Sequence, residues 1–240
     1  MSIIFQTSCF MGNARAGKTL SMVETGYNTL LEIKIEVKRL KDKGKLNDTE
    51  KKRLSILDKI EIWSNLTLNK RIFGDYRKID VTEILEIYDK KEEITNKLIM
   101  IDDIFKAVDS RNFMKKENKA FGYFLKEIGK KHNILLYVSH FDTDVEIRLR
   151  NLTDVFVLCK KGRFQKIKLP NGNDIDVFIE EKNYYELKTE KELKNMVVYQ
   201  MYFKKFIDFD NYFVLKRELV DEKYIKAFKY FKYYNTMEVV

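Results

Sequence analysis

The segment from Gly12 to Thr19 reads Gly-Asn-Ala-Arg-Ala-Gly-Lys-Thr and matches the pattern G-x-x-x-x-G-K-[ST]. An apolar run from Ile3 to Met11 precedes it and predicts a strand. A helical pattern begins near Leu20. A strand before and a helix after this pattern are the context that a phosphate-binding P-loop requires.

Each fixed position of this pattern has a chemical reason. The two glycines let the backbone N–H groups point inward at a phosphate chain, and the dipole of the next helix adds positive potential. We expect Lys18 to reach the β- and γ-phosphates of ATP and the Thr19 hydroxyl to bind Mg²⁺. The predicted nucleotide-binding residues are Gly12, Asn13, Ala14, Arg15, Ala16, Gly17, Lys18, Thr19 and Leu20.

A second motif lies about eighty residues downstream. Residues Lys97–Ile101 form an apolar run that ends in Asp102 and Asp103. This pattern is typical of a buried strand with acids at its carboxyl end, the edge at which open α/β sheets bind ligands. We expect Asp102 to hold Mg²⁺, usually through water, and Asp103 to polarise the attacking water.

Composition limits the class of protein. The chain has 240 residues, 45% of them hydrophobic, which suits one α/β domain with appendages. Its net charge of +9 favours polyanionic partners, although genome bias or adaptation to heat also produces lysine-rich chains. Cys9 and Cys159 lie in apolar runs and resemble buried thiols of a reducing compartment. No apolar run approaches the roughly 18 residues of a membrane span, so we expect a cytoplasmic or virion-associated protein.

The pattern between the two motifs is mostly helical. Apolar residues at helical spacing predict a long helix over Leu20–Leu40, and a second amphipathic stretch follows Asp48. Together they predict a helical hairpin inserted at about residues 30–60. A strand is expected over Glu61–Leu68, and Asp80 is expected to cap a helix from Val81 to about Lys91.

Further site candidates follow the second motif. A helix over Phe113–Lys131 leads to a buried strand ending at Ser139, after which His140 can sense the γ-phosphate. A short helix then presents Arg148 and Arg150, which are either surface charges or donors to transition-state phosphate charge.

The C-terminal third has a different pattern. A strand over Thr153–Cys159 is followed by a predicted β-hairpin, Phe164–Ile179, that turns at Asn171-Gly172. Met196–Phe203 and Tyr212–Leu215 predict another strand pair. From Asp221 a helix is expected, with Tyr224, Phe228 and Phe231 on one face. Its aromatic and basic residues favour a docking face with solvated lysines over base stacking.

These motifs occur in an order that resembles the FtsK/HerA-type ATPases, over residues 1 to about 160. Within that group the chain looks most like viral genome-packaging ATPases and their Zot-like relatives. The resemblance rests on the P-loop, Trp63-Ser64-Asn65, Asp102-Asp103, Asp109-Ser110-Arg111, Gly129-Lys130-Lys131, Leu136–His140, Asp144-x-x-x-Arg148-x-Arg150 and, in the tail, Tyr234-Asn235-Thr236-x-Glu238.

The resemblance implies a ring, usually of six subunits, with Arg148 or Arg150 acting across the interface as an arginine finger. Two positions depart from the family pattern: Asp103 stands where the family often has glutamate, and His140 stands where a sensor glutamine is common. Filamentous-phage Zot proteins carry a membrane span, and its absence here favours a soluble motor.

The sequence therefore predicts an α/β P-loop ATPase of the RecA-like FtsK/HerA type, with a mainly parallel sheet flanked by helices. Residues 1–160 form the expected core and residues 161–240 a small α+β extension. We expect an ATP hydrolase that translocates double-stranded DNA into a capsid through phosphate contacts, and that docks on a capsid or membrane protein. The alternative is a Zot-like assembly ATPase that acts on protein. A small-molecule kinase is disfavoured because the sequence shows no arginine-rich substrate lid. A GTPase is disfavoured because Asn96-Lys97-Leu98-Ile99 lacks the aspartate that reads guanine.

Overall fold

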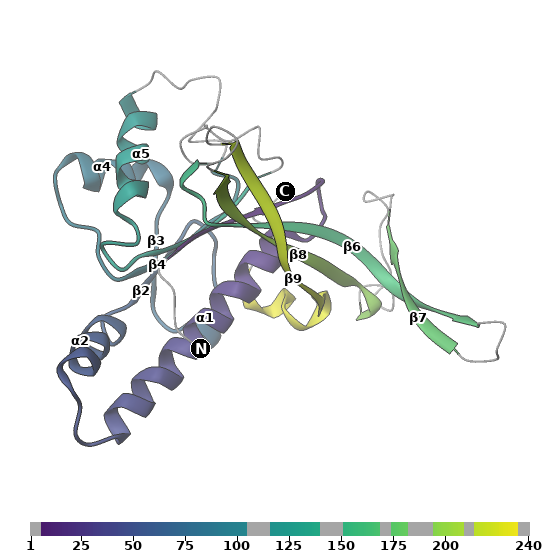
Figure 1. Cartoon of the computed structure of the whole chain (residues 1–240), viewed down its shortest axis with the longest axis horizontal. Helices are drawn as coiled ribbons and strands as arrows, with labels where there is room; N and C mark the ends of the chain where they lie inside the picture. The colour runs from purple at the N-terminus through teal and green to yellow at the C-terminus, as the bar shows by residue number, and fades with distance from the viewer. Residues whose placement is uncertain are drawn as a thin grey trace.

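A computed structural model of the chain describes residues 6–104, 116–139, 151–168, 174–181, 194–208 and 214–234. Their strands form one mixed sheet, in the order β3-β2-β4-β5-β1-β6-β8-β9, with β7 paired to β6 alone (Figure 1). The strands are β1 Thr7–Met11, β2 Glu61–Ser64, β3 Tyr76–Lys78, β4 Lys97–Ile101, β5 Ile134–Val138, β6 Val155–Lys168, β7 Asp174–Glu180, β8 Val197–Asp208 and β9 Val214–Lys226.

The sheet has a parallel half and an antiparallel half. Strands β3, β2, β4, β5, β1 and the first part of β6 pair in parallel. The pairs β6–β7, β6–β8 and β8–β9 are antiparallel. Strand β6 runs without a break across residue 160, the expected end of the ATPase core, so the extension continues the sheet of the core. Strand β6 is one element where the sequence predicts two, the strand Thr153–Cys159 and the first strand of the hairpin that begins at Phe164.

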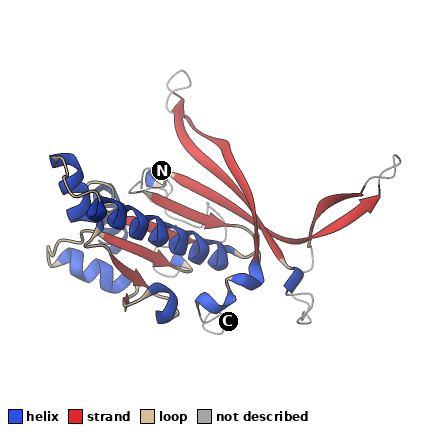
Figure 2. Ribbon diagram, turned by 90° about the horizontal axis from the view of Figure 1, so that it is seen from below, coloured by secondary structure: helices blue, strands red, loops and turns tan. Residues whose placement is uncertain are grey.

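Helices cover both faces of the parallel half (Figure 2). On one side α1, Lys18–Asp42, packs beside α2, Asp48–Leu57. On the other side lie α4, Val81–Asp89, and α5, Lys116–Glu127. A short α3, Lys70–Phe73, packs through Phe73 on the α1 side. The expected cap of α4 is confirmed, because the Asp80 side chain accepts a hydrogen bond from the Glu83 N–H.

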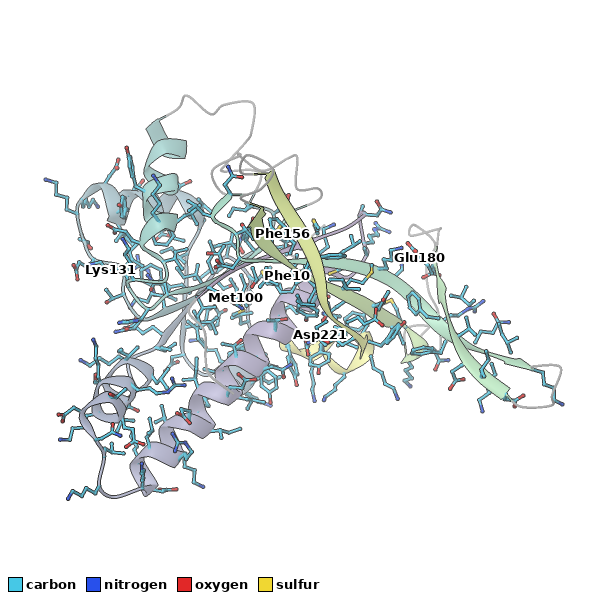
Figure 3. All side chains as sticks on the ribbon, in the orientation of Figure 1. Phe10, Met100, Lys131, Phe156, Glu180 and Asp221 are labelled. Atoms are coloured by element: carbon cyan, nitrogen blue, oxygen red, sulfur yellow. The ribbon has the colours of Figure 1, made fainter. Side chains whose placement is uncertain are left out.

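Alternation along the strands divides the interior into two cores. In β4, Leu98 and Met100 join the cluster on the α1 side, whereas Ile99 and Ile101 join the cluster under α4 and α5. This is the pattern of a strand buried on both faces, as its unbroken apolar sequence predicts. Phe10 and Met100 lie at the centre of the molecule, close to α1 (Figure 3).

The predicted helix from Asp221 is wrong. Residues up to Lys226 belong to β9, and in the described residues that follow, up to Tyr234, there are two 3-10 turns, Ala227–Lys229 and Phe231–Tyr233. The aromatic spacing suggested a helical face, yet burial in this segment alternates with period two, since Tyr224 is 45% exposed and Ile225 is 6% exposed. Cross-strand packing decides the outcome: the Tyr224 ring stacks on Tyr199 of β8 with centroids 4.5 Å apart.

Other expected elements are present with altered bounds. Strand β2 ends at Ser64 rather than Leu68, and the Ser64 hydroxyl accepts a hydrogen bond from the Leu66 N–H where the ladder stops. The antiparallel pairing of β6 with β7 is confirmed, and the two strands project beyond the helices as an arm (Figure 1). The predicted turn at Asn171-Gly172 lies outside the described residues. In the described part of the chain, no helix combines the length and apolar character that a membrane crossing needs.

Candidate nucleotide-binding site

The loop between β1 and α1 has the backbone geometry that its sequence predicts. Gly12 has φ of 145° and Gly17 has φ of 91°, and Gly17 is the N-cap residue of α1. Within the loop the Ala16 N–H donates to the Asn13 carbonyl at 3.1 Å. Positive φ at these two positions favours glycine, so the loop conformation depends on both.

Close neighbours make the same glycines necessary. A Cβ atom at Gly12 would lie 2.5 Å from the carbonyl oxygen of Cys159 in β6. A Cβ atom at Gly17 would lie 2.5 Å from a methyl group of Val198 in β8. The loop is thus backed by two strands that the sequence analysis placed at the end of the core and in the extension.

Lys18 folds back over the loop that precedes it. Its Nζ donates to the carbonyl oxygens of Gly12 at 3.0 Å and Asn13 at 2.9 Å. Burial lowers the pKa of Lys18, while the nearby acidic groups, Asp102 among them, oppose this shift. The amine is therefore held at the loop, where the phosphates of a nucleotide are expected.

Thr19 and Asp102 meet although β1 and β4, the strands that precede them in the chain, are not neighbours in the sheet. Strand β5 lies between β1 and β4, and the Thr19 Oγ1 donates to Asp102 Oδ1 at 2.9 Å across the end of β5. Asp102 is 8% exposed, and burial raises its pKa. A hydroxyl and a carboxylate from the two predicted motifs thus form one oxygen cluster at the carboxyl edge of the sheet.

This pair of oxygens fits Mg²⁺. The cation prefers oxygen ligands and keeps much of its water shell, so it needs few protein ligands besides nucleotide phosphates. Within the described residues no group of three or more His, Cys, Asp or Glu side chains is arranged to hold a metal by itself. The residues that would hold Mg²⁺ are the predicted ones, Thr19 and Asp102.

Asn65 fixes the backbone of Asp102. Its Nδ2 donates to the Asp102 carbonyl at 2.8 Å, and its Oδ1 accepts from the Asp102 N–H at 2.8 Å. Asn65 follows β2, the strand next to β4. Trp63-Ser64-Asn65 is part of the motif order in the sequence, but no role for it was predicted. The sequence signal for this role is an amide side chain at the carboxyl end of β2, the strand next to the one that ends in Asp102.

Of the remaining predicted site residues, some are described by the structure and others are not. Asp103 follows Asp102 with φ of 51°, a left-handed conformation that aspartate tolerates better than most residues, and it is half-buried. Ser139 is fully buried at the end of β5, and its N–H donates to the Phe10 carbonyl at 3.0 Å. His140, Arg148 and Arg150 lie outside the described residues.

Cys159 completes the surroundings of Lys18. The residue is buried, and burial raises the pKa of its thiol to about 12. A thiol with so high a pKa is neutral and packs as a small apolar group, as the sequence predicts for both cysteines. No metal or redox role follows from it.

Comparison with known proteins gives structural similarity alone. No protein-family model and no curated protein matches the chain. The N-terminal domain of zonular occludens toxin from Neisseria meningitidis aligns with 97% of this chain and 100% of its own, at 12% identity and a TM-score of 0.47. The genome packaging NTPase B204 from Sulfolobus turreted icosahedral virus 2, in complex with ATP-gammaS, aligns with 92% of this chain and 100% of its own, at 12% identity and a TM-score of 0.39.

A third structure, the DNA-packaging ATPase B204 from Sulfolobus Turreted Icosahedral Virus, aligns with 92% of this chain and 100% of its own, at 11% identity and a TM-score of 0.38. The chain resembles these proteins in fold only, at identities of 11% to 12% and TM-scores of 0.38 to 0.47. Its own loop and sheet order have a P-loop ATPase-like fold. Any function must follow from the residues of the site itself.

Proposed function

We propose that this protein binds Mg-ATP at the loop between β1 and α1 and hydrolyses it. The observation that carries the proposal is the meeting of Thr19 and Asp102 at 2.9 Å, beside a lysine held at the phosphate-binding loop. Two motifs separated by more than eighty residues converge on one edge of the sheet. Their side chains are those that phosphoryl transfer requires.

The proposed reaction is in-line attack of water on the γ-phosphate. A P–O bond forms to the water oxygen, the bond between the β–γ bridging oxygen and the γ-phosphorus breaks, and ADP and inorganic phosphate leave. The loop amides and Lys18 hold the phosphates, and Asp103 orients the water and accepts its proton. When bound, Mg²⁺ neutralises charge that develops on the phosphate oxygens. In this proposal His140 senses the γ-phosphate and Arg148 or Arg150 of a neighbouring subunit completes the site.

We further propose that hydrolysis drives double-stranded DNA through a ring of subunits, as a genome-packaging motor. The support is the net charge of +9, together with the motif order of the sequence. Contacts should be mainly to phosphates, so binding should weaken steeply with salt and show little sequence preference. The motor would dock on a capsid or membrane protein.

One observation favours the alternative, an assembly ATPase that acts on protein. On the arm of β6 and β7, Ile167, Ile175 and Ile179 lie on one face and are 40%, 41% and 37% exposed. Charges at the base of the arm are paired within it, Lys160 with Glu180 at 2.9 Å and Lys161 with Glu181 at 3.4 Å. Arg163 and Gln165 share this face with the isoleucines. A face that is apolar over much of its length suits a protein partner better than phosphates.

Steady-state ATP hydrolysis with and without linear double-stranded DNA tests both readings. We expect hydrolysis that DNA stimulates and that falls by roughly a hundredfold or more in Lys18→Ala, because the variant loses the amine that binds the phosphates. Stimulation should fade as salt rises. Hydrolysis that depends on Lys18 but is indifferent to DNA would favour the protein-directed alternative, and equal rates in wild type and Lys18→Ala would refute the ATPase.

A further inference from the structure

A row of polar side chains crosses the antiparallel half of the sheet behind the loop. Cys159 of β6 pairs with Gln200 of β8, and Gln200 pairs with Lys223 of β9. Register partners point to the same face of a sheet, so these three side chains lie side by side. Lys223 shows which face this is, because it reaches a residue of α1.

That residue is Glu24. The Lys223 Nζ lies 2.9 Å from Glu24 Oε2 and 3.1 Å from Oε1. Glu24 is only 3% exposed, and its Oε1 also accepts from Asn28 Nδ2 at 2.5 Å. The same ammonium group lies 5.4 Å from the centre of the Tyr202 ring. The pair thus joins the helix of the P-loop to the outer strand of the sheet, with the carboxylate buried and the lysine side chain 36% exposed.

Other contacts at this level of the helix are weaker. Among the described residues, the buried Nε2 of Gln200 in β8 has no hydrogen-bond partner. Ser21 and Thr25 of α1 are neutral hydroxyls that approach Cys159 and Tyr202. A charge-assisted contact is stronger than one between neutral groups, so the ion pair is a strong polar contact between α1 and these strands.

The same strands contact the loop itself. Gly12 abuts the Cys159 carbonyl and Gly17 abuts Val198, so β6 and β8 form the wall against which the loop rests. Glu24 lies five residues after Thr19 on α1. A shift of α1 relative to the wall would move Lys18 and Thr19 together, since both belong to the first turn of that helix.

We propose that Lys223, acting through Glu24, is a positioning residue of the nucleotide site and holds α1 in register with the wall behind the loop. This inference rests on the proposed nucleotide binding. It makes β9, a strand outside the expected ATPase core, part of the support of the site.

The proposal predicts that removing Lys223 from its ion pair with Glu24 weakens phosphate binding. In Lys223→Met the Glu24 carboxylate would stay buried, with the Asn28 amide still donating to it but with no cation beside it. An uncompensated buried charge is strongly unfavourable, and it is relieved when α1 moves until the carboxylate reaches water. That movement displaces Lys18 and Thr19, so phosphate binding weakens.

The test uses four variants and two measurements. The variants are Lys223→Met, Lys223→Arg, the double variant Glu24→Gln with Lys223→Met, and the matched control Lys226→Met, an exposed lysine on the same strand. The first measurement is hydrogen exchange of the amides of residues 12–19 without nucleotide. The second is the Kd of a fluorescent ATP analogue in the presence of Mg²⁺.

For Lys223→Met we expect faster exchange in the loop and a Kd raised by roughly tenfold or more, with Lys226→Met within about twofold of wild type. Lys223→Arg should recover most of the affinity, because it restores the charge-assisted contact. A folded Lys223→Met protein with unchanged exchange and Kd would overturn the proposal.

The double variant separates positioning from stability. It removes both charges, so it folds even if Lys223→Met does not. Because no buried carboxylate remains to draw α1 outward, a Kd in the folded double variant that recovers relative to Lys223→Met supports positioning through Glu24, whereas a Kd as weak as that of Lys223→Met overturns the proposal. If wild type itself fails to bind the ATP analogue, the proposed function fails, while the exchange measurement still decides whether Lys223 orders the loop.

Discussion

The Asp102 carboxylate is nearly buried, and its backbone is held from both sides by the Asn65 amide. Such a carboxylate costs folding free energy when it is ionised and no cation is present. Its hydrogen bond from Thr19 offsets part of this cost, yet burial dominates and the pKa of Asp102 is raised. The ionised carboxylate is thus placed to bind a cation, and without one it lowers the free energy of unfolding.

Asp102→Asn should therefore stabilise the nucleotide-free protein at neutral pH. The folded-state pKa lies above the usual 3.8, so the carboxyl group favours folding when protonated and loses that contribution as pH rises through the raised pKa. Asparagine keeps an oxygen that can accept from Thr19 and carries no charge. Urea unfolding across acid to neutral pH should show a gain that shrinks as pH falls.

Asp75→Asn, at an exposed position, is the control and should change little. A loss of stability in Asp102→Asn at neutral pH would show that the Thr19 hydrogen bond outweighs the burial of the charge. With Mg-nucleotide present the order should reverse, because the variant loses a metal ligand.

At the scale of elements, the sequence predicts those helices, strands and loops whose formation depends on residues close together in the chain. The loop, α1, β4 and α4 follow from glycine spacing, apolar runs and the Asp80 cap, each of which is encoded within a few residues. The later part of β9 was missed because Tyr224 and its neighbours fit a helical face equally well, although the strand predicted over Tyr212–Leu215 overlaps the beginning of β9. The choice between helix and strand at Tyr224 depends on its pairing with Tyr199 of β8, and such a cross-strand partner leaves no local signal.

One acidic residue of α1 links that helix to α2. Glu36 of α1 contacts Arg39 of its own helix at 2.7 Å and Arg53 of α2 at 3.0 Å. The hydrogen bond from Arg39, more than any other contact, lowers the pKa of Glu36 to about 2. A carboxylate shared by two guanidinium groups is stronger than an isolated surface pair.

Glu36→Gln should lower the free energy of unfolding by about 1 kcal/mol at neutral pH. The pKa is depressed from 4.5 to about 2, so the contribution is complete above 4.5 and is lost as pH falls toward 2. Denaturant unfolding of the variant and wild type should therefore converge in acid. Glu32→Gln, exposed on the same helix, is the matched control; an equal loss there would mean that net charge, rather than the contact with Arg53, is responsible.

At the scale of the whole molecule, the sheet places residues from distant parts of the chain in one site. Lys18, Thr19 and Asp102 could be predicted because their motifs carry the chemistry in the sequence. Cys159 and Val198 could not, since each is an ordinary residue of a strand and matters only through the order β1-β6-β8. Asn65 is intermediate: its position at a strand end was visible, but its partner depends on β2 lying beside β4.

The largest assembly that the proposal requires is a ring in which one subunit completes the site of the next. Arg148→Ala and Arg150→Ala should then show which arginine acts, the effective one reducing hydrolysis by roughly 10³-fold or more. Mixing that variant with Lys18→Ala, inactive by itself, should restore activity, because some interfaces then combine an intact Lys18 with an intact arginine. For random mixing in equal amounts, roughly a quarter of the interfaces of a closed ring are of this kind. An arginine that acts within its own subunit gives no recovery, and if neither substitution affects hydrolysis, the finger lies elsewhere.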